Sequence, residues 1–278
     1  MVTVLVLVLA VLIYGVFFEP RQIVVNHVWI ESDRLAEVFG EKTVIQISDL
    51  HIQKTGKLET KLLSLLNDLK PDVIFLTGDY VRWRGDYEVA LDFLSTLTNK
   101  VPAWGVLGDY DYSRSRKSCL FCHEPESTKP TRRHQVKFLK NSSEMIELPN
   151  GSILVGGIDL EGENTLLLKE KMRSFQNHFP AIILSHSPLI FDLIDDKKDV
   201  LILSGDTHGG QIMLPKWLWK ALGYAKNIRY EQGYFEEGLK KMYVNRGIGT
   251  SHVPIRILRC PELVVFHFRP ASPKHRFG

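Results

Sequence analysis

The chain has 278 residues, of which 44% are hydrophobic, so it is long enough for one large α/β domain or two small ones with a substantial core. Its 35 basic and 32 acidic residues give a formal charge of +3, which is too small to make nucleic acid the main partner. The composition therefore predicts a globular protein and argues against a dedicated nucleic-acid-binding protein.

The first twenty residues differ in kind from the rest of the chain. The segment from Val2 to Phe18 has no charged residue, and about 17 apolar residues are at the lower limit for crossing a bilayer. No Lys or Arg precedes the segment and no small-residue cleavage site follows it. We therefore favour an uncleaved membrane anchor over residues 1–20, in preference to a signal sequence or a buried core helix. The basic residues that follow the segment predict a cytoplasmic location for the remaining chain: Arg21, Arg34 and Lys42.

Beyond the anchor, the sequence predicts a juxtamembrane segment (21–42), one α/β domain (43–270) and a short tail (271–278). Short β-branched segments alternate with helical patterns, in the order strand 43–48, helix 58–70, strand 71–77, helix 86–100 and strand 101–108. Further strands are expected at 152–158, 181–185, 200–204, 241–245 and 262–268. This alternation is typical of a layered α/β domain.

Each of the three early strands is followed by an acidic residue, namely Asp49, Asp79 and Asp109. Their spacing of roughly 30 residues is that of successive βαβ units. The three carboxylates should therefore gather at one edge of the sheet, where open α/β sheets bind their ligands. Helix capping or an Asx turn would explain one such residue, but it explains three less well.

Histidines occur at the same kind of position. His51 lies two residues after Asp49, so both side chains can point to the same side. One later strand is followed by His186, and another by Asp206 and His208. The candidate metal ligands are thus oxygen and nitrogen donors at strand ends: Asp49, His51, Asp79, Asp109, His186, Asp206 and His208. Such a set needs no cysteine and suits Mn, Fe, Mg or Zn.

The ordered segments ISDLH, LTGDY, SHSP and GDTHGGQ, followed by YVNRGIGTSHVPIRILRCPEL, resemble the calcineurin-like metallophosphoesterase superfamily. Within it they are similar to the membrane-anchored branch that includes UDP-2,3-diacylglucosamine diphosphatase-like enzymes and bacterial phosphodiesterases. The resemblance runs from about Val44 to Phe268. It implies a four-layer αββα sandwich preceded by one transmembrane helix, and hydrolysis of a phosphodiester or pyrophosphate bond. A lipid-linked phosphoester such as a glycolipid nucleotide is one candidate substrate.

The resemblance also implies a role for each residue. One divalent ion would be held by Asp49, His51 and His208, and a second by Asp109, His186 and Asp206, with Asp79 bridging the two. Two such ions clamp a phosphoryl group and generate hydroxide for in-line attack at neutral pH. The residues expected to take part directly in catalysis are Asp79, Tyr110 and His186.

Three residues depart from the family pattern. Asp109 replaces an Asn, Tyr110 replaces a His, and Asp206 replaces the first His of the G-H-x-H motif. The two added carboxylates favour a hard, oxygen-loving ion. Because the family uses the replaced histidine near the leaving group, general-acid help would be missing or supplied by Tyr110. We therefore expect a leaving group that needs little protonation, and keep a non-catalytic membrane-anchored sensor of metal or haem as the alternative.

One motif lies outside this scheme. Cys119, Cys122 and His123 form C-x-x-C-H, the pattern of c-type haem attachment. The surrounding sequence is polar and offers no apolar pocket for a porphyrin. Haem, a disulfide, a redox or zinc pair, and an incidental arrangement all stay open.

Overall fold

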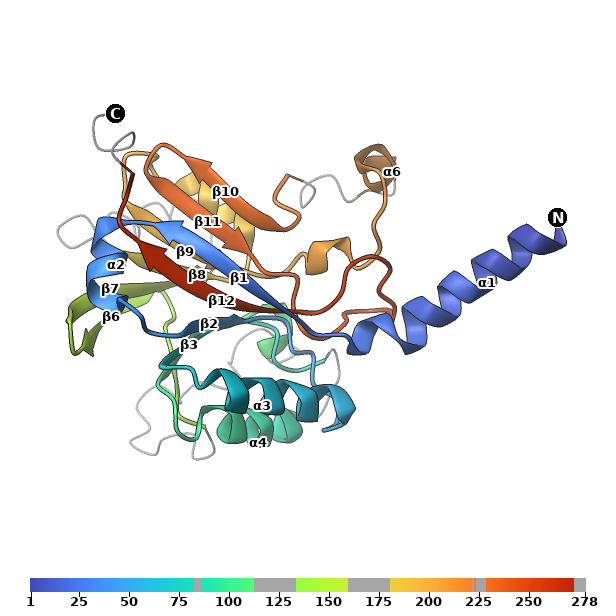
Figure 1. Ribbon diagram of the computed structural model, residues 1–278, viewed down its shortest axis with the longest axis horizontal. Coiled ribbons are helices and arrows are strands. Elements are labelled where there is room, and N and C mark those ends of the chain that lie inside the picture. The colour runs from blue at the N-terminus through green and yellow to red at the C-terminus, as the bar shows by residue number, and fades with distance from the viewer. Residues whose placement is uncertain (83–86, 113–133, 160–180, 222, 224–228, 273–278) are drawn as a thin grey trace.

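Two six-stranded mixed sheets pack face to face as a sandwich, and one helix projects from its side (Figure 1). The computed structural model describes residues 1–82, 87–112, 134–159, 181–221, 223 and 229–272. The expected α/β sandwich is confirmed, and its strands lie close to the positions that the sequence predicts.

The first sheet has the order β1 (Val24–Glu31), β12 (Glu262–Arg269), β2 (Val44–Ile47), β3 (Val73–Thr77), β4 (Ala103–Val106) and β5 (Val136–Phe138). Strands β2 to β5 are parallel, so their carboxyl ends meet at one edge. The segment expected only as a juxtamembrane link contains two elements of the domain. Strand β1 pairs along its full length with β12, and helix α2 (Asp33–Phe39) follows it.

The second sheet has the order β10 (Gly233–Glu237), β11 (Lys240–Val244), β9 (Val200–Ser204), β8 (Ile182–Ser185), β7 (Gly151–Ile158) and β6 (Ser142–Leu148). Its four central strands are parallel, and antiparallel hairpins close both edges. The carboxyl ends of β8 and β9 therefore also lie together.

The core lies between the sheets, where Phe75 and Val106 of the first sheet pack with Leu184 and Leu203 of the second. Helices α3 (Lys57–Leu69) and α4 (Tyr87–Thr98) cover the outer face of the first sheet (Figure 1). Among the described residues, the outer face of the second sheet is covered by the 3-10 helix η3 (Pro188–Leu193). A complete fourth layer of helix stays a prediction.

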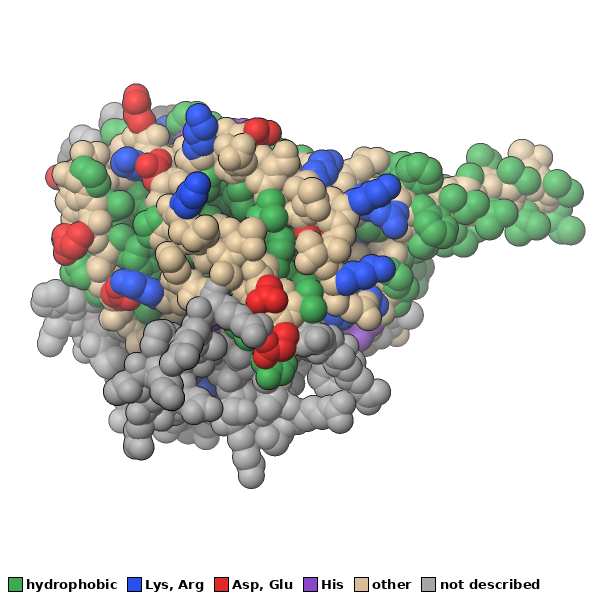
Figure 2. All heavy atoms as spheres, turned by 90° about the horizontal axis from the view of Figure 1, so that it is seen from below, with side chains coloured by type: hydrophobic (Ala, Val, Ile, Leu, Met, Phe, Trp, Pro, Cys, Tyr) green, Lys and Arg blue, Asp and Glu red, His purple; other side chains and the backbone are tan. Residues whose placement is uncertain are grey.

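Helix α1 (Val2–Phe17) projects from the sandwich, and Gly15 is its one buried residue. Ile255 and Ile257 pack against this glycine, where a Cβ atom would lie 2.8 Å from Ile257 Cγ1. The helical segment Val2–Arg21 is long and apolar enough to cross a membrane. Both a membrane anchor and a signal sequence have this property. Figure 2 shows hydrophobic side chains along α1 and Lys and Arg side chains on the body near its base. The short 3-10 helix η1 (Glu19–Arg21) joins α1 to the sandwich.

Candidate metal centre

Loops at the carboxyl ends of strands from both sheets meet in one buried site. Asp49 and His51 follow β2, Asp79 follows β3, His186 follows β8, and His208 begins the 3-10 helix η4 (His208–Gly210) after β9. They form two groups that can hold a metal ion, Asp49–His51–His208 and Asp49–Asp79–His186. Within each group the ligand atoms all lie within 4.8 Å of one another, and every residue is buried.

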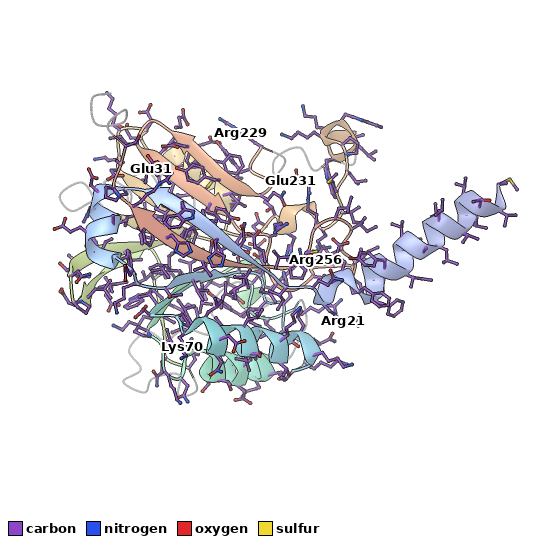
Figure 3. All side chains as sticks on the ribbon, viewed as in Figure 1. Arg21, Glu31, Lys70, Arg229, Glu231 and Arg256 are labelled. Carbon is purple, nitrogen blue, oxygen red and sulfur yellow. The ribbon has the colours of Figure 1, made fainter. Side chains whose placement is uncertain are left out.

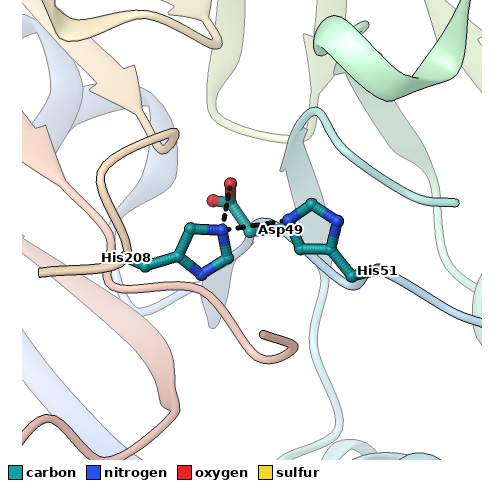
Figure 4. Close-up of side chains that lie close together, drawn as sticks. All are labelled: Asp49, His51 and His208. Carbon is teal, nitrogen blue, oxygen red and sulfur yellow. Dashed lines mark hydrogen bonds and ion pairs between the residues drawn. The ribbon is translucent and has the colours of Figure 1, made fainter. Parts of the chain in front are cut away.

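In the first group, two imidazoles and one carboxylate point at a common position (Figure 4). His51 Nε2 lies 2.9 Å from His208 Nε2, which in turn lies 3.5 Å from Asp49 Oδ1. Burial lowers the pKa of His51 to about 3 and the pKa of His208 well below its ordinary value. Both rings are therefore neutral at pH 7, and a neutral imidazole is the form that binds metal.

In the second group, one nitrogen of His186 is fixed by the backbone and the other is left for a ligand. His186 Nδ1 lies 2.7 Å from the carbonyl oxygen of Thr77 and donates to it. Nε2 is buried, has no hydrogen-bond partner in the described part of the chain, and lies 3.6 Å from Asp79 Oδ2. Burial disfavours its charge, but Asp79, Asp49 and Asp206 raise the pKa of His186 well above its ordinary value. The proton held there occupies a position that suits a metal cation.

Asp79 lies between the two groups. Its Oδ2 is 3.4 Å from His51 Nε2 and 3.6 Å from His186 Nε2, so it contacts one histidine of each group. Burial raises the pKa of Asp79 well above its ordinary value, and the nearby carboxylates Asp111 and Asp49 raise it further. Carboxylates this close and this buried need a positive counter-charge to ionise together. The residues present therefore fit two divalent ions.

Two of the seven predicted ligands, Asp109 and Asp206, belong to neither group among the described residues and instead line the adjoining cavity. The backbone N–H of Asp206 lies 3.2 Å from both carboxylate oxygens of Asp49. Burial raises the pKa of Asp206 to about 6. The structure thus brings five of the predicted residues into direct contact and places the other two at the edge.

The backbone around the site is strained. Five of the seven predicted ligands have the positive φ angle that L-residues rarely adopt: Asp49, His51, Asp79, Asp206 and His208. Glycines allow the chains to approach here, since a Cβ atom at Gly108 would lie 2.2 Å from Asp79 Oδ1. Such strain typically persists where the surrounding structure enforces it for function.

Asp111 supports the site, although it is not among the residues predicted from the sequence. Its buried carboxylate accepts hydrogen bonds from the backbone N–H groups of Gly108, Asp79 and Tyr80, each at 2.8 Å. These bonds hold the turn after β3 against the turn after β4. The signal lay in the segment LGDYDYS, where the second aspartate follows the first at a spacing of two.

Arg256 is a second such residue, and it is fully buried close to the base of helix α1 (Figure 3). Its guanidinium donates to the carbonyl oxygens of Arg246, Gly247 and Gly249, and Nη2 lies 3.4 Å from His208 Nδ1. The Gly249 N–H donates in turn to the carbonyl of Asp49 at 2.7 Å. This arginine lies in the segment YVNRGIGTSHVPIRILRCPEL, but the sequence does not show that its side chain turns back onto carbonyl oxygens earlier in the same segment.

A cavity of about 590 Å³ opens beside the two groups. Its lining includes the polar residues Asp79, Asp109, Asp206 and His208, together with the apolar residues Ile212, Trp219, Val253 and Ile255. Trp219 comes from the short helix α6 (Lys216–Ala221). The cavity can therefore accept a phosphoryl group beside the buried carboxylates and histidines, together with an apolar group.

Tyr110 lines the same cavity, on the 3-10 helix η2 (Asp109–Asp111). Its backbone N–H donates to Asp79 Oδ1 at 3.1 Å, and its ring lies edge-on to His51 at 5.1 Å between centroids. Burial and nearby carboxylates raise the pKa of Tyr110 to about 12. The hydroxyl therefore stays protonated at neutral pH.

The motif Cys119, Cys122 and His123 lies outside the described residues.

A model of the calcineurin-like phosphoesterase family matches residues 42–210, and the chain belongs to this family of phosphoester hydrolases. The chain is 27% identical to the uncharacterized metallophosphoesterase YkoQ of Bacillus subtilis, over 93% of this chain and 97% of that protein. It is 26% identical to the UDP-2,3-diacylglucosamine pyrophosphatase LpxG of Chlamydia muridarum, over 91% of each chain. It is 27% identical to the phosphodiesterase YaeI of Escherichia coli, over 80% of each chain.

We expect Mn²⁺ to stabilise the protein more at pH 7 than at pH 5. The folded pKa of Asp206, about 6, lies above its ordinary value of 3.8. Between these values the folded chain binds more protons than the unfolded chain, so the stability of the metal-free protein falls as pH rises. Metal binds the deprotonated carboxylates, so its stabilising effect should grow over the same range. Thermal unfolding at pH 5, 6 and 7, with EDTA or with Mn²⁺, measures this difference, and an equal rise in Tm at all three pH values would contradict it.

Proposed function

We propose that the chain hydrolyses a phosphodiester or pyrophosphate bond at a dinuclear divalent-metal centre. The observation that carries the proposal is the pair of buried groups that share Asp49 beside the cavity. When bound, two divalent ions supply the charge that clamps a phosphoryl group and activate water at neutral pH. The oxygen-rich ligand set favours a hard ion such as Mn²⁺ or Mg²⁺, with Fe and Zn as further candidates.

We assign the ligands as the family pattern implies. Asp49, His51 and His208 would hold one ion, and His186 would hold the other ion. Asp79 would bridge the two ions. This assignment is supported by the contacts of Asp79 with His51 and His186. Asp109 and Asp206 would complete the second site from the cavity wall.

We further propose that the substrate carries a lipid. The support is the set of apolar residues that line the cavity, which includes Val253 and Ile255. Val253 is also exposed, as are Met213, next to the lining residue Ile212, and Leu258. The name of the similar protein LpxG, a UDP-2,3-diacylglucosamine pyrophosphatase, gives the chemical class: a nucleotide linked through pyrophosphate to an acylated sugar.

The proposed membrane anchor contacts the same part of the chain. The backbone N–H of Arg256 donates to the carbonyl of Gly15 in α1 at 2.9 Å, and Met213 N–H donates to the carbonyl of Ile257 at 2.9 Å. If α1 spans the bilayer uncleaved, the apolar rim of the cavity lies at the lipid headgroups, where apolar and basic side chains are both stable. We propose that the catalytic domain lies on the cytoplasmic side, because Arg21 and other basic residues follow α1.

The test uses the purified full-length protein in detergent, supplied in turn with Mn²⁺, Mg²⁺, Zn²⁺ and Fe²⁺. Three substrates are compared: bis(p-nitrophenyl) phosphate, UDP-2,3-diacylglucosamine and a UDP-sugar without acyl chains. We expect metal-dependent hydrolysis of the aryl diester, and a higher kcat/KM for the acylated nucleotide than for the matched soluble one. A protein that binds metal yet hydrolyses none of the three would be the non-catalytic sensor. Equal rates with both nucleotides would remove the lipid from the proposal.

A further inference from the structure

Tyr110 has a partner within the cavity, His252, which lies in the segment YVNRGIGTSHVPIRILRCPEL and is not among the predicted metal ligands. Tyr110 Oη lies 3.3 Å from His252 Nε2, and the two rings are nearly perpendicular, at 84° with centroids 6.2 Å apart. Tyr110 follows β4, whereas His252 lies in the segment between β11 and β12. The pair therefore joins two separate walls of the cavity, and both residues line it.

The position of the Tyr110 hydroxyl is set by its other contacts. Its backbone N–H is bonded to Asp79 Oδ1 and its ring edge lies on His51, so both of the buried groups hold it in place. The direction of the O–H bond is not set in this way, because a phenol hydroxyl rotates to suit its neighbours. A donor to Oη allows the hydroxyl proton to point elsewhere, whereas an acceptor captures it. His252 is exposed to the cavity and can supply Nε2–H as such a donor.

We propose that His252 is a positioning residue whose Nε2–H donates to Tyr110 Oη and so turns the Tyr110 hydroxyl toward the bond that breaks. The inference rests on the proposed function. In the hydrolysis, water first loses a proton to solvent, a bond forms between phosphorus and the resulting hydroxide oxygen, and the bond between phosphorus and the departing oxygen breaks. Tyr110 donates a hydrogen bond to the departing oxygen and keeps its own proton. The departing oxygen leaves with the electron pair of the broken bond.

This arrangement selects a class of substrate. A hydrogen bond without proton transfer is sufficient for a leaving group that is stable as an anion, such as the phosphate released from a pyrophosphate or an aryl oxide. An alkoxide needs a proton to leave, and this pair does not deliver one. The pair therefore favours phosphoanhydrides and aryl esters over alkyl phosphodiesters.

The experiment measures kcat and KM of the full-length, Mn²⁺-loaded protein with aryl phosphodiesters of graded leaving-group pKa and with one alkyl phosphodiester. The variants are Tyr110→Phe, His252→Ala, His252→Gln and the double variant Tyr110→Phe with His252→Ala. The matched control is His27→Ala, which removes another exposed histidine bonded to a side chain, on the distant strand β1. Metal content is measured for every protein.

We expect Tyr110→Phe and His252→Ala each to lower kcat about tenfold, the typical cost of one neutral hydrogen bond, with KM and metal content unchanged. The loss should increase with leaving-group pKa. The double variant should be no slower than Tyr110→Phe alone, because His252 acts through Tyr110. His252→Gln should recover part of the rate, since its side-chain N–H can donate in the same place. The ¹⁵N chemical shift of the His252 ring should show a protonated Nε2.

The inference is overturned if His252→Ala keeps the wild-type kcat, or if the losses multiply in the double variant. An unprotonated Nε2 also overturns it. If the wild-type protein binds Mn²⁺ and hydrolyses no ester, the proposed function fails and this inference fails with it. If the wild-type protein is active and only the pattern among variants differs, the proposed function stands and the role of His252 alone is refuted.

Discussion

Replacing Asp79 with Asn should lower phosphoester hydrolysis by about a thousandfold or more. The Oδ2 atom of Asp79 lies 3.4 Å from His51 Nε2 and 3.6 Å from His186 Nε2. The amide of the Asp79→Asn variant is neutral, so it lacks the negative charge that would hold two cations at bridging distance. The measurements are kcat/KM for an aryl phosphodiester and metal content by elemental analysis. Near-normal turnover with two ions bound would refute the dinuclear proposal.

The same variant should not destabilise the metal-free protein. Burial and the neighbouring carboxylates oppose the charge on Asp79, and an amide removes that repulsion. The bond from the Tyr110 N–H to Oδ1 can be kept by the amide oxygen. We therefore expect the Tm in EDTA to be unchanged or higher while activity is lost. The matched control is Asp68→Asn on the exposed face of α3, which should leave both quantities unaltered.

The sequence predicts the central strands and the buried residues at their ends because both depend on local pattern. An apolar segment followed by a polar turn places Asp49, Asp79 and His186 at carboxyl ends of parallel strands, whatever the details of packing. The two residues Asp49 and His51 share a side because they are two apart. Such regularities are visible in one dimension, and the structure brings these residues together.

The parts that the sequence does not reveal depend on contacts between distant segments. Strand β1 becomes part of the first sheet only because it pairs with β12, which lies more than 200 residues later in the chain. Arg256 lies in a segment that resembles the family, but its role depends on carbonyl groups of a loop that packs on Asp49. His252 meets Tyr110 only after β4 and the β11–β12 segment are brought to the same cavity. Tertiary folding, and not local propensity, decides each of these positions.

Asp206 provides the test of the departures from the family pattern, because it lines the cavity beside the buried groups without belonging to either. If it is a ligand of the second ion, Asp206→Ala should remove one ligand and lower metal affinity and kcat/KM by about a hundredfold. Asp206→His should rebuild the G-H-x-H motif and reduce the negative charge of the site by one. Hydrolysis should then survive, with metal preference shifted toward zinc, since imidazole suits zinc better than it suits magnesium.

Whether Asp206 is a ligand is tested by measuring the metal content by elemental analysis and kcat/KM with each added ion, for the wild type and both variants. The exposed Asp195→Asn serves as the control for a lost carboxylate outside the site. The backbone N–H of residue 206 donates to Asp49 in wild type, and both substitutions retain that N–H, so a loss in Asp206→Ala belongs to the missing carboxylate. If the three proteins carry the same metals in the same ratio and turn over alike, Asp206 is not a ligand, and the second ion depends on Asp79 and His186 with Asp49.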